Sequence, residues 1–244
     1  MKILGFFLVI FCLSCCSNGQ DRLDPIDEYY NKHVGDTLAS ICHESVSNGS
    51  LEHGKLLPYH GNNYSYFDTT SYFSGRAFLH EDVLAFTLKA YKELQSVSDR
   101  FYRIMECSNK KGGKLLPHQT HQNGTSIDFM MPLTKDHKPY YKLDKTGVSH
   151  YWLTFDDAGK YSEDKSVEID FEAIAQHILL LNEAAKEKGW KIKKVIIKIE
   201  LKDELYATPS GKKLKANGIY VVQGLSKLVN TLHDEHYHID FAKF

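Results

Sequence analysis

Alternating apolar and polar positions predict two strands, at about residues 125–131 and 235–241. In each strand the large apolar side chains share one face. These faces hold Ile127, Phe129 and Met131 in the first strand, and Tyr237, Ile239 and Phe241 in the second. The opposite faces carry Asp128 in the first strand and the pair His236 and His238 in the second. Both strands therefore present polar, potentially ligating side chains away from their own apolar faces.

Two segments have the spacing of apolar residues that is typical of amphipathic helices, at about residues 80–95 and 171–188. The first places Glu81 and Asp82 at its N-terminus, where the helix dipole favours negative charge. Gly189 directly follows the second and is a common helix terminator. Both helices are expected to pack their apolar stripes against a sheet.

Further strands are expected at about residues 149–155 and 192–201. The second contains the β-branched run 195–199, which suits a buried strand. Strands and helices do not alternate as regular βαβ units. The pattern therefore predicts an α+β fold, with a mainly antiparallel sheet, flanking helices and a metal site on one sheet face.

Charge and cysteine content limit the possible partners of the chain and the possible roles of its cysteines. The chain has 30 basic and 31 acidic residues. This balance argues against nucleic acid as a partner, because nucleic-acid binding usually requires a strongly basic face. Cys42 and Cys107 are spaced unlike a structural zinc site, and in an oxidising compartment they are candidates for one disulfide.

Histidines and an aspartate gather in two stretches far apart in the chain, residues 118–128 and 233–238, which hold five of the 13 histidines. Imidazole and carboxylate are ligands of catalytic zinc, which takes three protein ligands and leaves one position for water. A purely structural alternative for the second stretch is a hydrogen-bonded histidine pair on a half-exposed sheet face. Each histidine cluster has a carboxylate on one face of a strand, Asp128 for the first and Asp240 for the second, and this pairing favours one metal site.

The spacing within the second stretch leaves two roles open. A two-residue step along a strand spans about 6.6 Å, so His236 and His238 can both reach one small site. Both could bind metal, or one could bind metal while the other acts as acid–base. Alternation turns Glu235 away from His236, so Asp234 is the more probable partner that orients a histidine, unless both acids are simply solvated.

These motifs resemble the penicillin-insensitive murein endopeptidases. The residues that carry the resemblance are H-x-x-H-Q-x-G-x-x-x-D at 118–128 and H-D-x-H-Y-H-I at 233–239. Upstream elements at 47–51, 54–58 and 76–80 are similar to that family as well, so the resemblance covers about residues 38–241. The family belongs to a metallopeptidase group that also includes lysostaphin-type enzymes, D-Ala-D-Ala carboxypeptidases and the hedgehog signalling domain.

The resemblance implies a role for each residue. His121, Asp128 and His238 would hold Zn²⁺. His236 would stand where the group keeps its general base or transition-state stabiliser. His118 and His233 would be the additional active-site histidines of this family. How these last roles divide is left open.

The implied function is a zinc-dependent endopeptidase that hydrolyses peptide cross-links of peptidoglycan, of the D-Ala–diaminopimelate type. Two alternatives remain. One is a D,D-carboxypeptidase that trims single stem peptides. The other is a non-catalytic, zinc-stabilised binding module, for which the hedgehog domain is the precedent. The sequence does not indicate an oligomeric state.

The N-terminal segment predicts export. A short basic start and an apolar run of 11 residues, 3–13, are typical of a signal peptide and too short to span a bilayer. The run ends in Leu13-Ser14-Cys15-Cys16, which resembles a bacterial lipobox. Cys16 is the expected lipidated residue, because Leu13 stands three places before it; Cys15 fits less well, and ordinary cleavage near residues 17–20 is the alternative.

The expected organisation has three parts: a lipoprotein signal peptide at 1–15, a tether at 16–37 and a metallopeptidase domain at 38–244. The mature protein is accordingly expected at the periplasmic or outer surface of a bacterial membrane, held there by its lipid.

Overall fold

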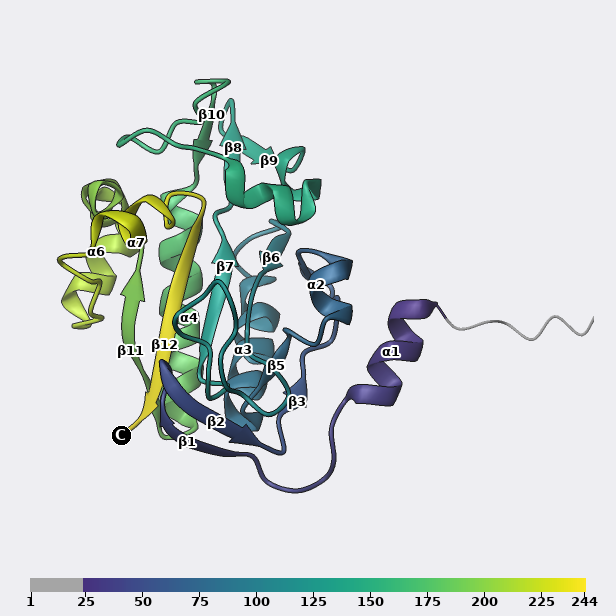
Figure 1. Ribbon diagram of the computed structural model, residues 1–244. Coiled ribbons are helices and arrows are strands. Elements are labelled where there is room, and N and C mark those ends of the chain that lie inside the picture. The colour runs from purple at the N-terminus through teal and green to yellow at the C-terminus, as the bar shows by residue number, and fades with distance from the viewer. Residues whose placement is uncertain (1–23) are drawn as a thin grey trace, which may run out of the picture.

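The structure, a computed structural model, describes residues 24–244 and is organised around a five-stranded sheet (Figure 1). The strand order is β11 (Trp190–Ile196), β12 (His236–Lys243), β7 (Ser126–Met130), β6 (Tyr102–Ile104) and β4 (Tyr64–Tyr66). All neighbours are antiparallel except β4 and β6. The predicted α+β fold with a mainly antiparallel sheet and flanking helices is confirmed.

Two long helices cover one face of this sheet, α3 (Glu81–Leu94) and α4 (Phe171–Glu187) (Figure 1). The apolar faces of β7 and β12 point at them. Phe241 of β12 packs on Phe86 of α3, with ring centroids 4.8 Å apart. Phe129 of β7 packs on His177 of α4 at 4.7 Å. Both helices lie within one or two residues of their predicted bounds, because their apolar periodicity matches the face that they bury.

Smaller elements surround the sheet. They are α1 (Pro25–His33), α2 (Thr69–Phe73), α5 (Lys202–Ala207), α6 (Pro209–Ala216), α7 (Lys227–Thr231), the 3₁₀ helices η1 (Leu143–Lys145), η2 (Gly147–Trp152) and η3 (Ile199–Leu201), the hairpin β1 (Ile41–Ser45) and β2 (Asn48–Glu52), the pair β3 (Lys55–Leu56) and β5 (Phe78–Leu79), and the small sheet β10 (Val167–Ile169), β8 (Leu133–Lys135) and β9 (Lys138–Tyr140). The hairpin and η2 both contact the segments that carry the histidine motifs.

The register between β7 and β12 brings the two motifs together. His238 pairs directly with Asp128, and His236 pairs with Met130. Directly opposite residues of neighbouring strands point to the same face. The polar side chains of both strands therefore lie on the face opposite α3 and α4.

Two strand predictions were wrong. Residues 147–152 form the 3₁₀ helix η2 instead of a strand at 149–155. The strand predicted to reach residue 201 ends at Ile196, which pairs with His238 close to the start of β12. Beyond that point β12 offers almost no further partner, and the chain turns into η3 and α5.

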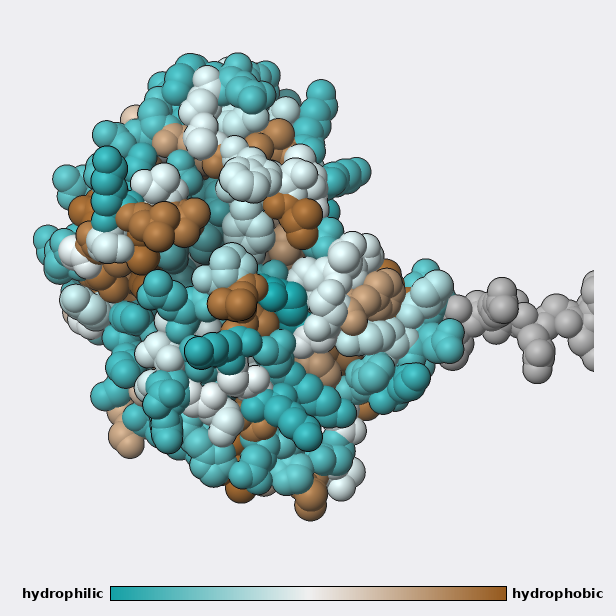
Figure 2. All heavy atoms as spheres, viewed as in Figure 1, coloured by the Kyte–Doolittle hydropathy of each residue, from teal (hydrophilic) through white to brown (hydrophobic). Residues whose placement is uncertain are grey.

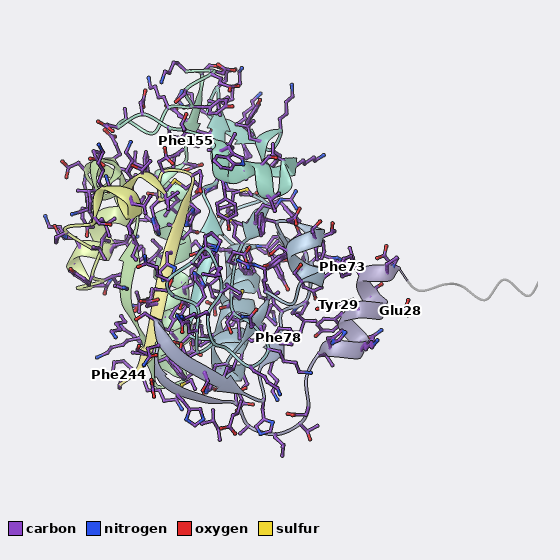
Figure 3. All side chains as sticks on the ribbon, in the orientation of Figure 1. Glu28, Tyr29, Phe73, Phe78, Phe155 and Phe244 are labelled. Atoms are coloured by element: carbon purple, nitrogen blue, oxygen red, sulfur yellow. The ribbon has the colours of Figure 1, made fainter. Side chains whose placement is uncertain are left out.

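Part of the segment expected to be a tether is folded. Asp24 caps α1 by accepting a hydrogen bond from the backbone N–H of Ile26 at 2.8 Å, and Pro25 suits the first helical position. Figure 3 shows Tyr29 of α1 beside Phe73 of α2, where the ring centroids are 5.1 Å apart. Residues 25–33 of the expected tether are therefore helical. Residues 1–23, with the expected signal peptide and Cys16, lie outside the described part.

Neither the disulfide nor a membrane span is found in residues 24–244. Cys42 and Cys107 are both free; Cys42 is half-buried in β1 and packs against the core, and Cys107 is buried within it. Burial raises the pKa of the Cys107 thiol well above its usual value. No helix in this part of the chain is long and apolar enough to cross a bilayer.

His177 is a buried histidine in the middle of the core. Its Nδ1 shares a 2.6 Å hydrogen bond with the hydroxyl of Tyr237, and its ring packs against Tyr91, Tyr102 and Phe129. Burial lowers the pKa of His177 to about 3. An unfolded histidine binds its proton at a pKa of about 6.5. Between this pKa and about 3, His177 binds a proton in the unfolded chain but stays neutral in the native core.

We expect His177 to make the protein less stable as the pH falls from about 6.5 towards 3, by up to about 1.4 kcal/mol per pH unit. Above pH 6.5 the effect is absent. His177→Gln should show a shallower loss of unfolding free energy over this range, measured by urea denaturation at pH 7, 6, 5 and 4. The surface variant His60→Gln is the matched control and should follow the wild type. Equal pH dependence in all three proteins would contradict the role of His177.

Candidate metal centre

The structure brings all six predicted site residues together on the sheet face opposite α3 and α4. Asp128 lies at the centre. Its Oδ1 shares a hydrogen bond with Nδ1 of His238 at 2.7 Å. Its Oδ2 lies 3.1 Å from Nε2 of His121, 3.5 Å from Nδ1 of His118 and 4.0 Å from Nε2 of His236. His233 completes the group, with its ring centroid 4.7 Å from that of His236.

The loop that carries His121 is fixed by its backbone. His121 has φ 67°, a left-handed conformation that is uncommon for residues other than glycine and is often found at functional sites. The next residue, Gln122, donates its backbone N–H to the carbonyl of Val46 in the β1–β2 turn at 2.9 Å. Gly124 has φ 74°, and a Cβ there would lie 2.9 Å from the backbone nitrogen of His80. A tight turn at Gly124 therefore leads into β7, and the β1–β2 hairpin packs against it.

The centre of the cluster contains buried polar atoms without hydrogen bonds among the described residues. Both ring nitrogens of His121 and Oδ2 of Asp128 are in this state, because the atoms that approach one another are not aligned as hydrogen bonds. Burying such atoms without a partner is costly, so each one requires an explanation. One ligand atom from each of His118, His121 and Asp128 lies within 4.8 Å of the others. This donor set fits a divalent transition-metal ion such as zinc.

His238 is held by two carboxylates. Its Nδ1 faces Asp128, and its Nε2 shares a 2.6 Å hydrogen bond with Oδ1 of Asp240. Burial opposes a charge on His238, but Asp240 and Asp128 outweigh it and raise the pKa of this ring to about 9. A carboxylate on the far nitrogen is the arrangement that orients metal-binding histidines.

Glu235, not Asp234, is the partner of His236. A carboxylate oxygen of Glu235 is hydrogen bonded to Nδ1 of His236. Asp234 instead accepts the backbone N–H of Phe155 at 3.1 Å. The expectation from strand alternation was wrong, because β12 begins at His236 and Glu235 precedes it. Burial opposes protonation of His236, yet Glu235 and Asp128 raise its pKa above the usual value.

The pKa values of the two flanking histidines, His118 and His233, are shifted in the opposite direction from those of His236 and His238. Burial, chiefly, lowers the pKa of His118 and of His233 to about 3. Nδ1 of His233 lies 2.6 Å from the carbonyl oxygen of Val229 in α7, to which it donates. This bond leaves Nε2 of the neutral ring as the nitrogen that can take up a proton. The site therefore combines a charged centre with neutral flanks.

Sequence reasoning missed Tyr151 and His150, which reach the site from η2. The Tyr151 ring lies 5.8 Å from His236 and 6.1 Å from His118, measured between centroids. Burial raises the pKa of the Tyr151 hydroxyl well above its usual value, and the nearby Glu106 carboxyl adds to this effect. Ring nitrogens of His150 lie 3.3 Å from the carbonyl oxygen of Leu143 and 3.2 Å from that of Glu235. Their segment was expected to be a strand, and no sequence motif marks either residue as part of the site.

Exposed apolar side chains flank the site on the segments that carry it. Leu116, two residues before His118, is 76% exposed, and Trp152, beside Tyr151, is 84% exposed. Leu228 and Leu232 lie in and just after α7, where Figure 2 shows an apolar patch. A separate hollow of about 460 Å³ between β10 and α5 contains none of the six site residues.

The sheet, its covering helices and the buried histidine–carboxylate cluster define an α+β protein with a candidate metal centre. The chain belongs to the penicillin-insensitive murein endopeptidase family, whose profile matches residues 43–242 and thus includes both histidine motifs. A search of curated proteins gave no match. Membership supports a murein endopeptidase that acts on peptidoglycan, and a murein-degrading enzyme works in the periplasm or at the cell surface.

If the cluster binds a metal ion, the substitution His121→Ala should abolish metal binding. His121 is fully buried, and neither of its ring nitrogens has a hydrogen-bond partner within residues 24–244. We expect the wild type to hold one equivalent of divalent metal and the variant to lose affinity by more than the roughly 10–100-fold typical of residues that only support a ligand. Competition with a chromophoric chelator measures this. His60→Ala on the surface is the control; equal affinity of all three proteins would rule His121 out as a ligand.

Proposed function

We propose that the protein is a zinc-dependent endopeptidase that hydrolyses peptide cross-links of the D-Ala–diaminopimelate type in peptidoglycan. The observation that carries this proposal is the buried Asp128 with His118, His121, His236 and His238 around it, several of whose polar atoms have no hydrogen-bond partner among the described residues. Family membership supplies the substrate class. The unpartnered ligand atoms supply the reason to expect a metal.

The proposed ligands are His121, Asp128 and His238. His238 is favoured over His118 because its far nitrogen bonds to Asp240, as metal-binding histidines usually require. Nδ1 of His118 also faces Asp128, at the longer distance of 3.5 Å. Bound zinc would polarise the scissile carbonyl and supply hydroxide near neutral pH, since it lowers the pKa of bound water to roughly 7.

His236 is the proposed general base. Glu235 occupies its Nδ1 and so leaves Nε2 as the nitrogen that faces Asp128 and the reacting groups. The same carboxylate raises the pKa of His236, which favours proton uptake at Nε2 from the attacking water. The proton can then pass from Nε2 to the leaving amine.

His118 and His233 flank this base and are proposed to serve the oxyanion or the leaving amine. Their rings lie on either side of the cluster, 5.2 Å from His121 and 4.7 Å from His236 respectively. Burial keeps both rings neutral, so neither adds a permanent positive charge beside the metal.

Two histidine variants test the ligand set. We expect His238→Ala to lose both bound metal and activity. His118→Ala should keep its metal while kcat falls by about 10²-fold or more, the usual cost of losing an acid–base group. Metal content by mass spectrometry and turnover of a cross-linked muropeptide measure the two properties. The reverse pattern would exchange the roles of His118 and His238.

The bond specificity is tested by digestion of purified peptidoglycan with residues 21–244, with and without chelator, analysed by mass spectrometry. Zinc-dependent conversion of cross-linked dimers to monomers supports the endopeptidase. Release of D-Ala from monomeric stem peptides alone indicates a D,D-carboxypeptidase. A folded, metal-loaded protein that cleaves neither substrate, and whose His236→Ala variant is unchanged in binding, would sink the enzyme proposal in favour of a binding module.

We also propose that the chain is lipid-anchored at Cys16. Two or more acyl chains hold a protein stably on a bilayer. Removing the cysteine that carries them removes the membrane anchor. In a bacterial host, Cys16→Ser should move the protein from the membrane fraction to the soluble fraction. Cys15→Ser, the adjacent control, should stay in the membrane fraction. Identical distribution of both variants would contradict this assignment.

A further inference from the structure

Tyr151 brings a hydroxyl to the histidine cluster from an element that belongs to neither motif. Its ring meets His236 edge-on at 5.8 Å and lies 6.1 Å from His118. These are the two histidines proposed to handle protons and the oxyanion. Tyr151 therefore lies beside the reacting groups and outside the set of proposed ligands.

The hydroxyl of Tyr151 is buried and has no hydrogen-bond partner among the described residues. Its surroundings are not short of polar groups. The nearby Glu106 carboxylate is occupied by Arg76 at 2.7 Å, Ser71 at 3.0 Å and Tyr66 at 3.4 Å. Buried phenols normally find a partner, so this hydroxyl is free to bond to a group other than the described residues.

The position of Tyr151 is rigid. The preceding residue, His150, is buried between the carbonyl groups of Leu143 and Glu235. The Tyr151 ring also meets Phe67 edge-on at 5.8 Å. Since Glu235 is the residue that orients His236, the phenol and the proposed base are fixed to one another through a single backbone group. Fixed donors of this kind stabilise developing charge without reorganisation.

We propose that Tyr151 is a catalytic residue whose hydroxyl donates a hydrogen bond to the scissile carbonyl oxygen as that oxygen becomes an oxyanion. The assignment rests on the proposed endopeptidase function. Tyr151 keeps its proton throughout: the O–H bond is not broken, and the hydrogen bond shortens as negative charge accumulates on the oxygen. The proton of the attacking water still goes to His236.

The test compares wild type, Tyr151→Phe and the control Tyr220→Phe, which removes the hydroxyl of a tyrosine that is 50% exposed. Phenylalanine preserves the ring contacts of Tyr151. Removing one oxyanion donor lowers kcat by about 10²-fold. We expect that loss on a cross-linked muropeptide with KM within about threefold of wild type, unchanged bound zinc, and Tyr220→Phe equal to wild type.

A second readout does not depend on turnover. A phosphinic analogue of the D-Ala–diaminopimelate bond mimics the tetrahedral intermediate, so its affinity should fall in parallel with kcat, whereas affinity for the uncleaved stem peptide should not. Isothermal titration measures both.

Three results would overturn the assignment. They are an unchanged kcat in Tyr151→Phe, a raised KM with unchanged kcat, and loss of zinc or of fold in that variant, which would make Tyr151 structural. A wild type that binds zinc but cleaves no cross-link would instead overturn the proposed function, and with it the role that rests on it.

Discussion

The pairing of β7 with β12 is the constraint on which the rest of the site depends. Asp128 and His238 are 110 residues apart, yet they lie directly opposite one another across the two strands and share a hydrogen bond. A slip of one residue would turn either side chain into the apolar layer beneath. Burial of Phe129, Tyr237 and Ile239 against the helices opposes such a slip. The core therefore sets the register, and the register assembles the site.

Burial within this small region acts differently on neighbouring groups. His236 and His238 lie beside carboxylates that outweigh desolvation and raise their pKa values. For His118 and His233 the nearby carboxylate Asp128 does not offset the cost of burial, so desolvation lowers their pKa values. One protein environment thus supplies imidazoles that hold protons and imidazoles that shed them.

The sequence predicted those parts of the site that follow from short-range periodicity. Alternation put Asp128 and His238 on polar strand faces, and the apolar stripes located both long helices. It failed where a regular strand has not yet begun and where a contact joins distant segments. Glu235 reaches His236 because the strand has not yet begun, and Tyr151 arrives on a 3₁₀ helix that carries no strong periodic pattern. The helix α1 was missed for a related reason: it is stabilised by Tyr29 packing on α2, 40 residues further along the chain.

If the chain carries a lipid at Cys16, the docking of α1 limits how far the folded part can extend from the membrane. With residues 25–33 packed against α2, only residues 16–24 separate the proposed lipid from the folded body. Nine extended residues span at most about 30 Å, whereas the 22 residues first taken as tether would span more than twice that. A lipid at Cys16 would accordingly confine the active site to the wall layers nearest the bilayer. Lengthening the segment 16–24, rather than altering any catalytic group, would change which layers of the wall the enzyme can reach.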